Sequence, residues 1–291
     1  MRLHNKWDPY IFLFLPLSVY VFVVSVPIFF SIYYSFMDWN GITKMKFVGF
    51  DNYVKMFSDK NLLTCILNSF KYSAINTIYQ VGLGLVMAIL IYQLIIGRNL
   101  VRVLLFTPVI ISTMAISQTF KKILAISPDG VVNAFLDSIG QGQLKTAFLS
   151  DMNITLYVVA LVEAYKYSGL YLVVFYTAFK GIDKHIIEAA VIDGVNGWQM
   201  YFHIKLPIIR PVIITSMVLV INGTLKAFDI PFILTNGGPG YTSELMSGYM
   251  FKAGFSNMDF GYASALSLLI VVICVGSIGI FTYLTKSKEV V

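Results

Sequence analysis

Charged residues are scarce in this chain. They make up 12% of its 291 residues, whereas hydrophobic residues make up 57%. Soluble domains carry about 25% charged residues, so this composition argues against a soluble globular protein and favours an integral membrane protein. The net charge of +6 does not indicate nucleic-acid binding, because the Lys and Arg residues lie between apolar stretches and form no basic face.

Residues for metal, redox and hydrolytic chemistry are also few. Two cysteines give no disulfide framework, and three scattered histidines give no metal-binding spacing. The sequence has no G-x-x-x-x-G-K-[ST] phosphate loop, and no Ser/His/Asp or Cys/His set converges on one side of the membrane. We therefore predict that the chain has no catalytic residue, metal site or cofactor of its own.

Long apolar stretches are abundant. A membrane-spanning helix needs about 20 mostly apolar residues. The first stretch exceeds the core of a signal peptide and has no cleavage site after it; Pro16 and Pro27 within it do not prevent a membrane helix. We predict an all-α integral membrane protein whose single transmembrane domain, residues 10–285, has short termini at 1–9 and 286–291. The six predicted spans are 10–36, 68–96, 101–124, 153–180, 208–234 and 260–285.

Basic residues predict the orientation of these spans. An even number of spans places both termini on one side. Lys and Arg are denser in the short segments on that side, which include 97–102 and 181–207. The positive-inside rule therefore predicts that both termini are cytoplasmic. The loops 37–67, 125–152 and 235–259 then face outward.

The segment 181–207 is polar and rich in turn signals. Residues 184–192 are predicted to form a short helix, and Asp193-Gly194 and Asn196-Gly197 are turn signals. A second helical segment is predicted at 198–204, and Pro207 is placed to start the fifth span. The segment is therefore predicted to form two short helices that lie at an angle to each other beneath the membrane. Composition alone also allows an amphipathic interfacial hairpin that only connects two spans.

The spacing within this segment resembles the EAA loop of bacterial ABC importer permeases. In that family the loop is a coupling helix that docks in a groove of a cytoplasmic ATPase; the glutamate meets the ATPase and the glycine makes the bend. The residues that carry the resemblance are Glu188, Ala189, Ala190, Asp193, Gly194, Ile204, Leu206 and Pro207.

Three further motifs, at 47–53, 235–240 and 259–265, resemble those of the carbohydrate-uptake branch of this binding-protein-dependent family, in the same order. Asn236 stands where the family often has Gly, and Asn tolerates the same left-handed backbone. The resemblance implies a type I ABC importer permease fold in the bacterial cytoplasmic membrane. It also implies four kinds of partner: a second homologous permease forming a heterodimer, two nucleotide-binding ATPase subunits that hold ATP and Mg, an extracytoplasmic sugar-binding protein, and membrane lipid.

Polar residues inside the predicted spans suggest where a substrate passes. Such residues are costly and usually face a cavity or a partner. Lys226 and Asp229 are three apart and are expected on one face of the fifth span. At a rise of about 1.5 Å per residue they fall in the outer third of the membrane core. We predict a polar, outward-opening cavity for the hydroxyls of a di- or oligosaccharide. Its predicted residues are Gln118, Glu163, Tyr165, Lys166, Asn222, Lys226 and Asp229, with Lys71, Asn76, Gln80, Tyr167 and Tyr171 nearby.

Alternatives remain at this stage. If the membrane boundary lies further in, the same polar residues are interfacial anchors whose lysines extend to the headgroups. In an ion-gradient-driven secondary transporter or channel, the charges would form an ion relay. A membrane scaffold or sensor subunit would not need them for uptake. The ion-driven alternative leaves the spacing of the loop unexplained.

Overall fold

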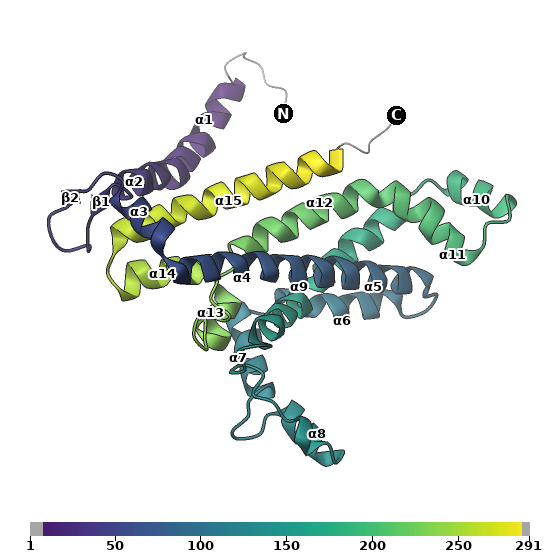
Figure 1. Ribbon diagram of the computed structural model, residues 1–291. Helices are drawn as coiled ribbons and strands as arrows, with labels where there is room; N and C mark the ends of the chain where they lie inside the picture. Colours follow the sequence, from purple (N-terminus) through teal and green to yellow (C-terminus); the bar gives the residue numbers. More distant parts are fainter. Residues whose placement is uncertain (1–7, 287–291) are drawn as a thin grey trace. The chain divides into compact units, whose positions relative to one another are not determined.

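The structure is a computed structural model that describes residues 8–286, and these residues are almost entirely helical (Figure 1). The predicted termini, 1–9 and 286–291, therefore lie almost wholly outside the described residues. The chain forms two compact units. One consists of residues 1–60 and 249–272, and the other of residues 61–248 and 273–291.

The first unit begins with two helices, α1 (Asp8–Tyr20) and α2 (Val26–Tyr34), joined by a π-helical turn at Val21–Ser25. Phe12–Tyr34 is apolar and long enough to cross a membrane. A short antiparallel hairpin follows, in which β1 (Met37–Asp38) pairs with β2 (Lys46–Phe47).

The outward motifs of the sequence hold this unit together. Helix α3 (Asp51–Ser58) follows the hairpin. The Asn52 amide donates hydrogen bonds of 2.9 Å to the carbonyl oxygens of Ser35 and Met37. A Cβ on Gly261 would lie 1.9 Å from the same Met37 oxygen. The motifs around Asn52 and Gly261 therefore fasten the end of α2, which is a structural role.

The second unit contains most of the helices. Its bundle is built from α4 (Lys60–Asn76), α5 (Gly82–Gln93), α6 (Arg98–Ile110), α7 (Thr113–Ile123), α8 (Val131–Ser138), α9 (Thr155–Lys180), α10 (Lys184–Ile192), α11 (Gly197–Gln199), α12 (Leu206–Leu225) and α13 (Asp229–Thr235). The remaining helices, α14 (Met246–Phe251) and α15 (Phe260–Lys286), each have residues in both units. π-helical turns lie at Thr77–Val81, Met200–Lys205 and Lys252–Ser256, and a 3-10 turn at Gly142–Leu144.

Helix α9 lies at the centre of the second unit. Its side chains form one apolar cluster with α5 and α12 and another with α4, α7 and α13. Glycines let neighbouring helices approach closely. A Cβ on Gly169 of α9 would lie 2.2 Å from the Leu105 carbonyl oxygen of α6, and a Cβ on Gly84 of α5 would lie 2.7 Å from Cβ of Tyr171 in α9.

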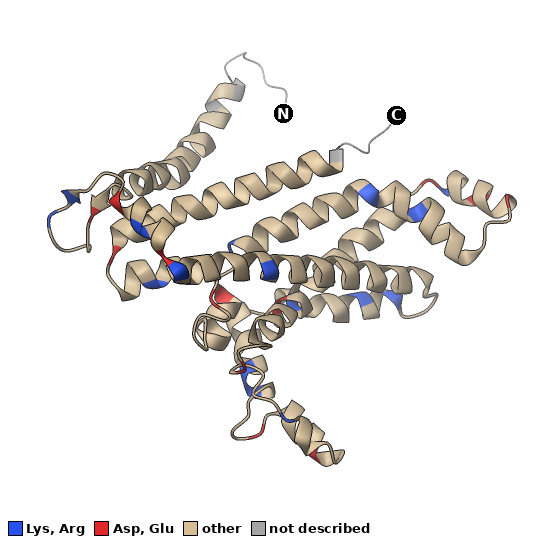
Figure 2. Ribbon diagram, in the orientation of Figure 1, with Lys and Arg blue, Asp and Glu red and all other residues tan. Residues whose placement is uncertain are grey.

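The spans agree with the sequence prediction in number and, for most, in place. Five helices are long and apolar enough to cross a membrane, or six if one bent pair counts as a span. Figure 2 shows the charged residues gathered mainly toward helix ends and connections. The second predicted span begins earlier than expected, since its helix runs from Lys60 to Gln93.

The third predicted span, 101–124, is broken near its middle. Helix α6 ends at Ile110, and α7 leaves it at an angle of 95°. Ile111 and Ser112 have extended backbone between them. Pro108 near the end of α6 has no N–H to donate, so the preceding turn is weakened.

Pro207 lies in the first turn of α12, as predicted, but helical residues precede it without a break. One helix runs from Gly197 to Leu225, so the predicted second short helix is the beginning of this span. Pro207 lies inside it, directly after the π-helical turn at Met200–Lys205. Such a turn accommodates the carbonyl that proline leaves without its usual donor.

Candidate functional site

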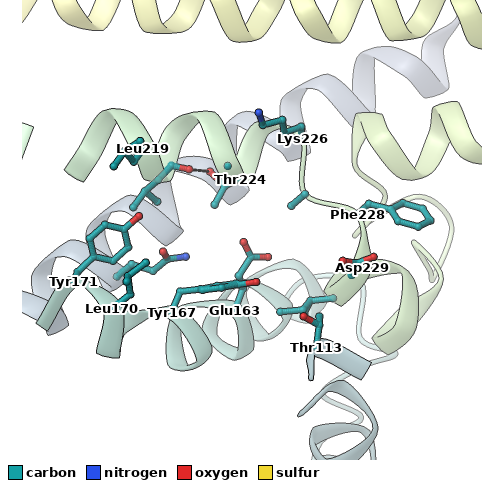
Figure 3. Close-up of a pocket in the computed structure, with 15 residues that line it drawn as sticks. Thr113, Glu163, Tyr167, Leu170, Tyr171, Leu219, Thr224, Lys226, Phe228 and Asp229 are labelled. Atoms are coloured by element: carbon teal, nitrogen blue, oxygen red, sulfur yellow. Dashed lines mark hydrogen bonds between the residues drawn. The ribbon is translucent and has the colours of Figure 1, made fainter. Parts of the chain in front are cut away.

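A cavity of about 380 Å³ lies in the second unit, where α9, α12 and α13 meet (Figure 3). Its volume falls in the range of small-molecule sites in proteins. Its lining is mixed, with carboxylates, hydroxyls, aromatic rings and aliphatic side chains. The lining residues are Gln80, Thr113, Glu163, Tyr167, Leu170, Tyr171, Leu219, Val220, Gly223, Thr224, Lys226, Ala227, Phe228, Asp229 and Ile230.

Glu163 of α9 is the central acidic group of the cavity. Its side chain is only 7% exposed, and its carboxylate accepts a hydrogen bond from the hydroxyl of the buried Tyr72 on α4. In Figure 3 the carboxylate points into the cavity. Asp229 lines the same space, so two carboxylates face it.

Hydrogen-bonded polar groups of α4 and the turn after it stand behind the wall. The Thr224 hydroxyl donates to the Ser73 hydroxyl at 2.9 Å, and the Gln80 amide donates to the Asn76 side-chain oxygen at 2.9 Å. Because these buried groups are paired, the wall offers ordered hydrogen-bonding groups to a polar ligand. A ligand with several hydroxyls needs such partners when it leaves water.

The prediction that Lys226 and Asp229 share one helix face was wrong. Helix α12 ends at Leu225, Lys226 is its C-cap, and α13 begins at Asp229. Pro231 explains the break, because proline is well tolerated in the first turn of a new helix and poorly inside one. Both residues nevertheless line the cavity, and in Figure 3 the Lys226 ammonium points away from Glu163 and Asp229.

Lys166 does not line the cavity, although it lies three residues after Glu163. Its side chain is 3% exposed. Its ammonium donates to the Ile111 carbonyl at 2.5 Å and lies 3.5 Å from the carbonyls of Pro108 and Val109. A cation is favourable at a helix C-terminus, so Lys166 stabilises the end of α6 at its bend. The bend in turn places Thr113, the first residue of α7, in the cavity wall.

Three other predicted pathway residues lie away from the cavity. Tyr165 is exposed and packs against Phe120, with ring centroids 5.3 Å apart. Gln118 is exposed and Asn222 is half-buried, and neither is among the lining residues. Thr113 and Thr224 line it without having been predicted, because an uncharged hydroxyl in an apolar helix gives no sequence signal.

The segment after α9 has the helix that the sequence predicts. Helix α10 spans Lys184–Ile192, and the Asp183 carboxylate caps it by accepting from the His185 N–H at 2.9 Å. Gly194 has φ of +77°. The N–H groups of Gly194 and Val195 donate to the Val191 and Ala190 carbonyls at 3.1 Å each, which is a Schellman motif. The glycine therefore makes the bend by its left-handed backbone.

The EAA-type residues divide between the two faces of this segment. Glu188 is 68% exposed, and Ala189, Asp193 and Pro207 are also exposed. Ala190 is buried, and Ile204 and Leu206 are half-buried. One face of α10 therefore packs on the bundle and the other is free to contact a partner.

Lys205 connects the segment to the bundle. It is buried, and its ammonium lies 4.4 Å from the ring centroid of Tyr92 on α5 and 4.5 Å from that of Tyr201. Cation–π contacts of this kind strengthen when they are desolvated. A second aromatic pair, Trp198 and Phe202, stacks at 5.9 Å and is exposed.

Comparison with known proteins identifies the family. Residues 80–290 match the family model "Binding-protein-dependent transport system inner membrane component", and the chain belongs to this family. It is therefore a permease subunit of an ABC transporter and a multi-pass inner-membrane protein.

Individual relatives agree with this assignment. The chain is 32% identical over 273 residues to the "Probable ABC transporter permease protein YurN" of Bacillus subtilis, and the match covers 92% of each chain. It is 27% identical over 288 residues to the "Multiple sugar-binding transport system permease protein MsmF" of Streptococcus mutans, which covers 98% of each. A chain from the crystal structure of a bacterial ABC transporter that imports alginate has the same fold. Its TM-score is 0.86 at 21% identity, and the match covers 98% of this chain and 97% of that one.

Proposed function

We propose that this chain is one of two permease subunits in an ATP-driven importer that moves a di- or oligosaccharide across the cytoplasmic membrane by alternating access. The observation that carries the proposal is the continuity between cavity and loop. Helices α9 and α12 both contribute residues to the cavity, and both lead into the exposed EAA-type segment. Family membership and a relative named for multiple sugars support it.

The connection gives a mechanism for coupling. Helix α9 ends at Lys180, four residues before α10, and the helix from Gly197 to Leu225 begins just after Gly194. That helix is roughly 43 Å long at 1.5 Å per residue. A partner that displaces α10 therefore moves two cavity walls, since Glu163 and Tyr167 belong to one helix and Val220 and Thr224 to the other.

The partners follow from the chemistry that the chain lacks. Two cytoplasmic ATPase subunits would bind ATP and Mg and contact the exposed face of α10 that carries Glu188. A second, homologous permease would complete the translocation path. An extracytoplasmic sugar-binding protein would deliver substrate to the outward loops 37–67 and 235–259. In this arrangement both termini are cytoplasmic.

The cavity favours an uncharged carbohydrate over an acidic one. Glu163 and Asp229 both face it, whereas the Lys226 ammonium is turned away (Figure 3). A uronate or phosphate group placed there would be repelled at low dielectric. The rings of Tyr167, Tyr171 and Phe228 offer flat apolar surfaces to a sugar ring.

The test is purification of the tagged chain from its native membrane in mild detergent, with the co-purifying proteins identified. The wild type should bring down a second permease and an ATPase. Glu188→Lys should lose the ATPase and keep the second permease, because this side chain is 68% exposed and its one ion pair within residues 8–286 is with the neighbouring His185.

Glu163→Gln is the matched control. It lies in the cavity and should keep the ATPase while uptake of sugar changes. A chain that purifies without any ATPase, in wild type and Glu188→Lys alike, would favour an ion-driven transporter instead.

A further inference from the structure

Helices α7 and α8, which follow α6, extend sideways from the helical bundle of the second unit. Helix α7 makes an angle of 95° with α6, and Figure 1 shows α7 and α8 running across the direction of α4, α5 and α6. Since α6 packs along the spanning helix α9, its direction follows the membrane normal. The α7–α8 extension therefore runs close to the membrane plane.

Helix α8 has an exposed apolar stripe. Val131, Phe135 and Ile139 follow one another at intervals of four and are 67%, 60% and 51% exposed. Residues at this spacing lie on one helix face. The stripe is the exposed side of α8, whose opposite side is held by hydrogen bonds. On the other side the buried Asn133 amide donates to the carbonyls of Ala125 at 3.1 Å and Thr146 at 3.3 Å.

The charges of residues 113–155 balance, with Lys121, Lys122 and Lys145 against Asp129, Asp137 and Asp151. Asp129 and Asp137 both pair with Lys145, and these hydrogen bonds raise the pKa of the Lys145 ammonium. The exposed Lys121 and Lys122 end α7 and have no acidic partner among the described residues. A cationic pair beside an apolar stripe matches the boundary between anionic headgroups and acyl chains.

The direction of the extension favours lipid over a binding protein. The α7–α8 extension projects along the membrane plane, whereas a binding protein would approach along the membrane normal. Ile110 and Met114 at the preceding bend are also exposed.

We propose that α8 is an interfacial anchor, with the Val131, Phe135 and Ile139 face inserted among lipid acyl chains and Lys121 and Lys122 at the headgroups. The anchor has a consequence for the cavity. Thr113 begins α7 and lines the cavity. Lipid contact at α8 therefore restrains this wall while α9 and α12 move.

Spin labels at single cysteines test the anchor in the complete transporter assembly in nanodiscs. Cys65 and Cys274 are buried and leave introduced sites free for labelling. Phe135→Cys and Val131→Cys place labels on the stripe. Ala134→Cys is the matched control, because it is exposed on the same helix and about 100° away from the centre of the stripe.

The collision rates of each label with oxygen and with a water-soluble nickel chelate give its surroundings. Labels at 131 and 135 should collide preferentially with oxygen, several-fold more than the label at 134. Preferential collision with the nickel chelate at 131 and 135 would mean that the stripe faces water and would overturn the anchor. Shielding from both reagents would mean that a protein covers the stripe, and would overturn it equally.

Nanodiscs of phosphatidylcholine with and without phosphatidylglycerol test the lysines. The label at 135 should lie deeper when the anionic lipid is present, and Lys121→Gln with Lys122→Gln should remove that difference. Equal depth in both lipid mixtures would overturn the headgroup contact of the two lysines.

Discussion

The two buried charged side chains in the middle of α9 have different roles. Glu163 faces the cavity and is held by the Tyr72 hydroxyl. Lys166, one turn further along, holds the carbonyls at the end of α6. A buried charge without partners is strongly unfavourable, and each of these two charges has its own hydrogen-bond partners. The position of a charge in a membrane helix therefore indicates burial, and only its partners indicate its function.

Lys166→Met should destabilise the protein because the Ile111 carbonyl and its neighbours lose their donor. An unsatisfied buried carbonyl costs about 1–3 kcal/mol. We expect a lower melting temperature in detergent and reduced uptake, as the bend relaxes and Thr113 shifts. Lys166→Arg retains the cation and should recover part of both. An unchanged melting temperature for Lys166→Met would show that the bend does not depend on this contact.

At the scale of elements, the helices are positioned by close backbone contacts as well as by apolar side chains. Gly169→Ala would put a Cβ 2.2 Å from a backbone oxygen of α6, and backbone cannot move aside as a flexible side chain can. Overpacking costs about 1–3 kcal/mol, so the folded yield should fall. Gly82→Ala is the control, since nothing lies within 4 Å of its added Cβ. Equal yields for the two variants would contradict the close α6–α9 contact.

Gly194→Pro should abolish uptake while the protein still inserts into the membrane. The native φ of +77° is inaccessible to proline, which requires about −65°. The bend between α10 and the following helix would then be rebuilt. Gly194→Ala should be milder, at about 1–2 kcal/mol for a left-handed backbone. Gly197→Ala, where no φ strain arises, should transport normally. Normal ATP-driven uptake by Gly194→Pro would refute the coupling role of the bend.

The same elements show what sequence could predict. Helix α10 was predicted with its observed bounds, and its end was marked by the local turn signal Asp193-Gly194. The breaks after Ile110 and Leu225 were not predicted, although Pro108 and Pro231 lie near them. Membrane helices often continue through proline. Whether they do depends on partners such as Lys166, which lie far away in sequence. Glu163, Lys226 and Asp229 were predicted near a cavity, but the separation of Lys166 from it required the fold.

At the scale of the whole molecule, the proposed importer has its cavity and its energy source on different chains. The described residues provide a polar cavity and an exposed α10, and the sequence provides no phosphate loop. An importer of this kind therefore needs an external ATPase, whereas an ion-driven transporter would use its own buried charges. Lys166 is engaged with backbone carbonyls, which leaves Glu163 and Asp229 as the acidic groups available for a relay in the cavity.

Transport measurements distinguish an ATP-driven importer from an ion-driven transporter. They use the complete assembly in proteoliposomes, with its binding protein and a radiolabelled neutral oligosaccharide. Uptake should require ATP on the side of the ATPase subunits and persist when a protonophore and a sodium ionophore remove ion gradients. Glu163→Gln should alter the sugar concentration for half-maximal uptake while uptake remains dependent on ATP, because its carboxylate faces the substrate and not an energy source. Uptake driven by an ion gradient without ATP, and lost in Glu163→Gln, would instead assign the buried carboxylates of this chain to ion coupling.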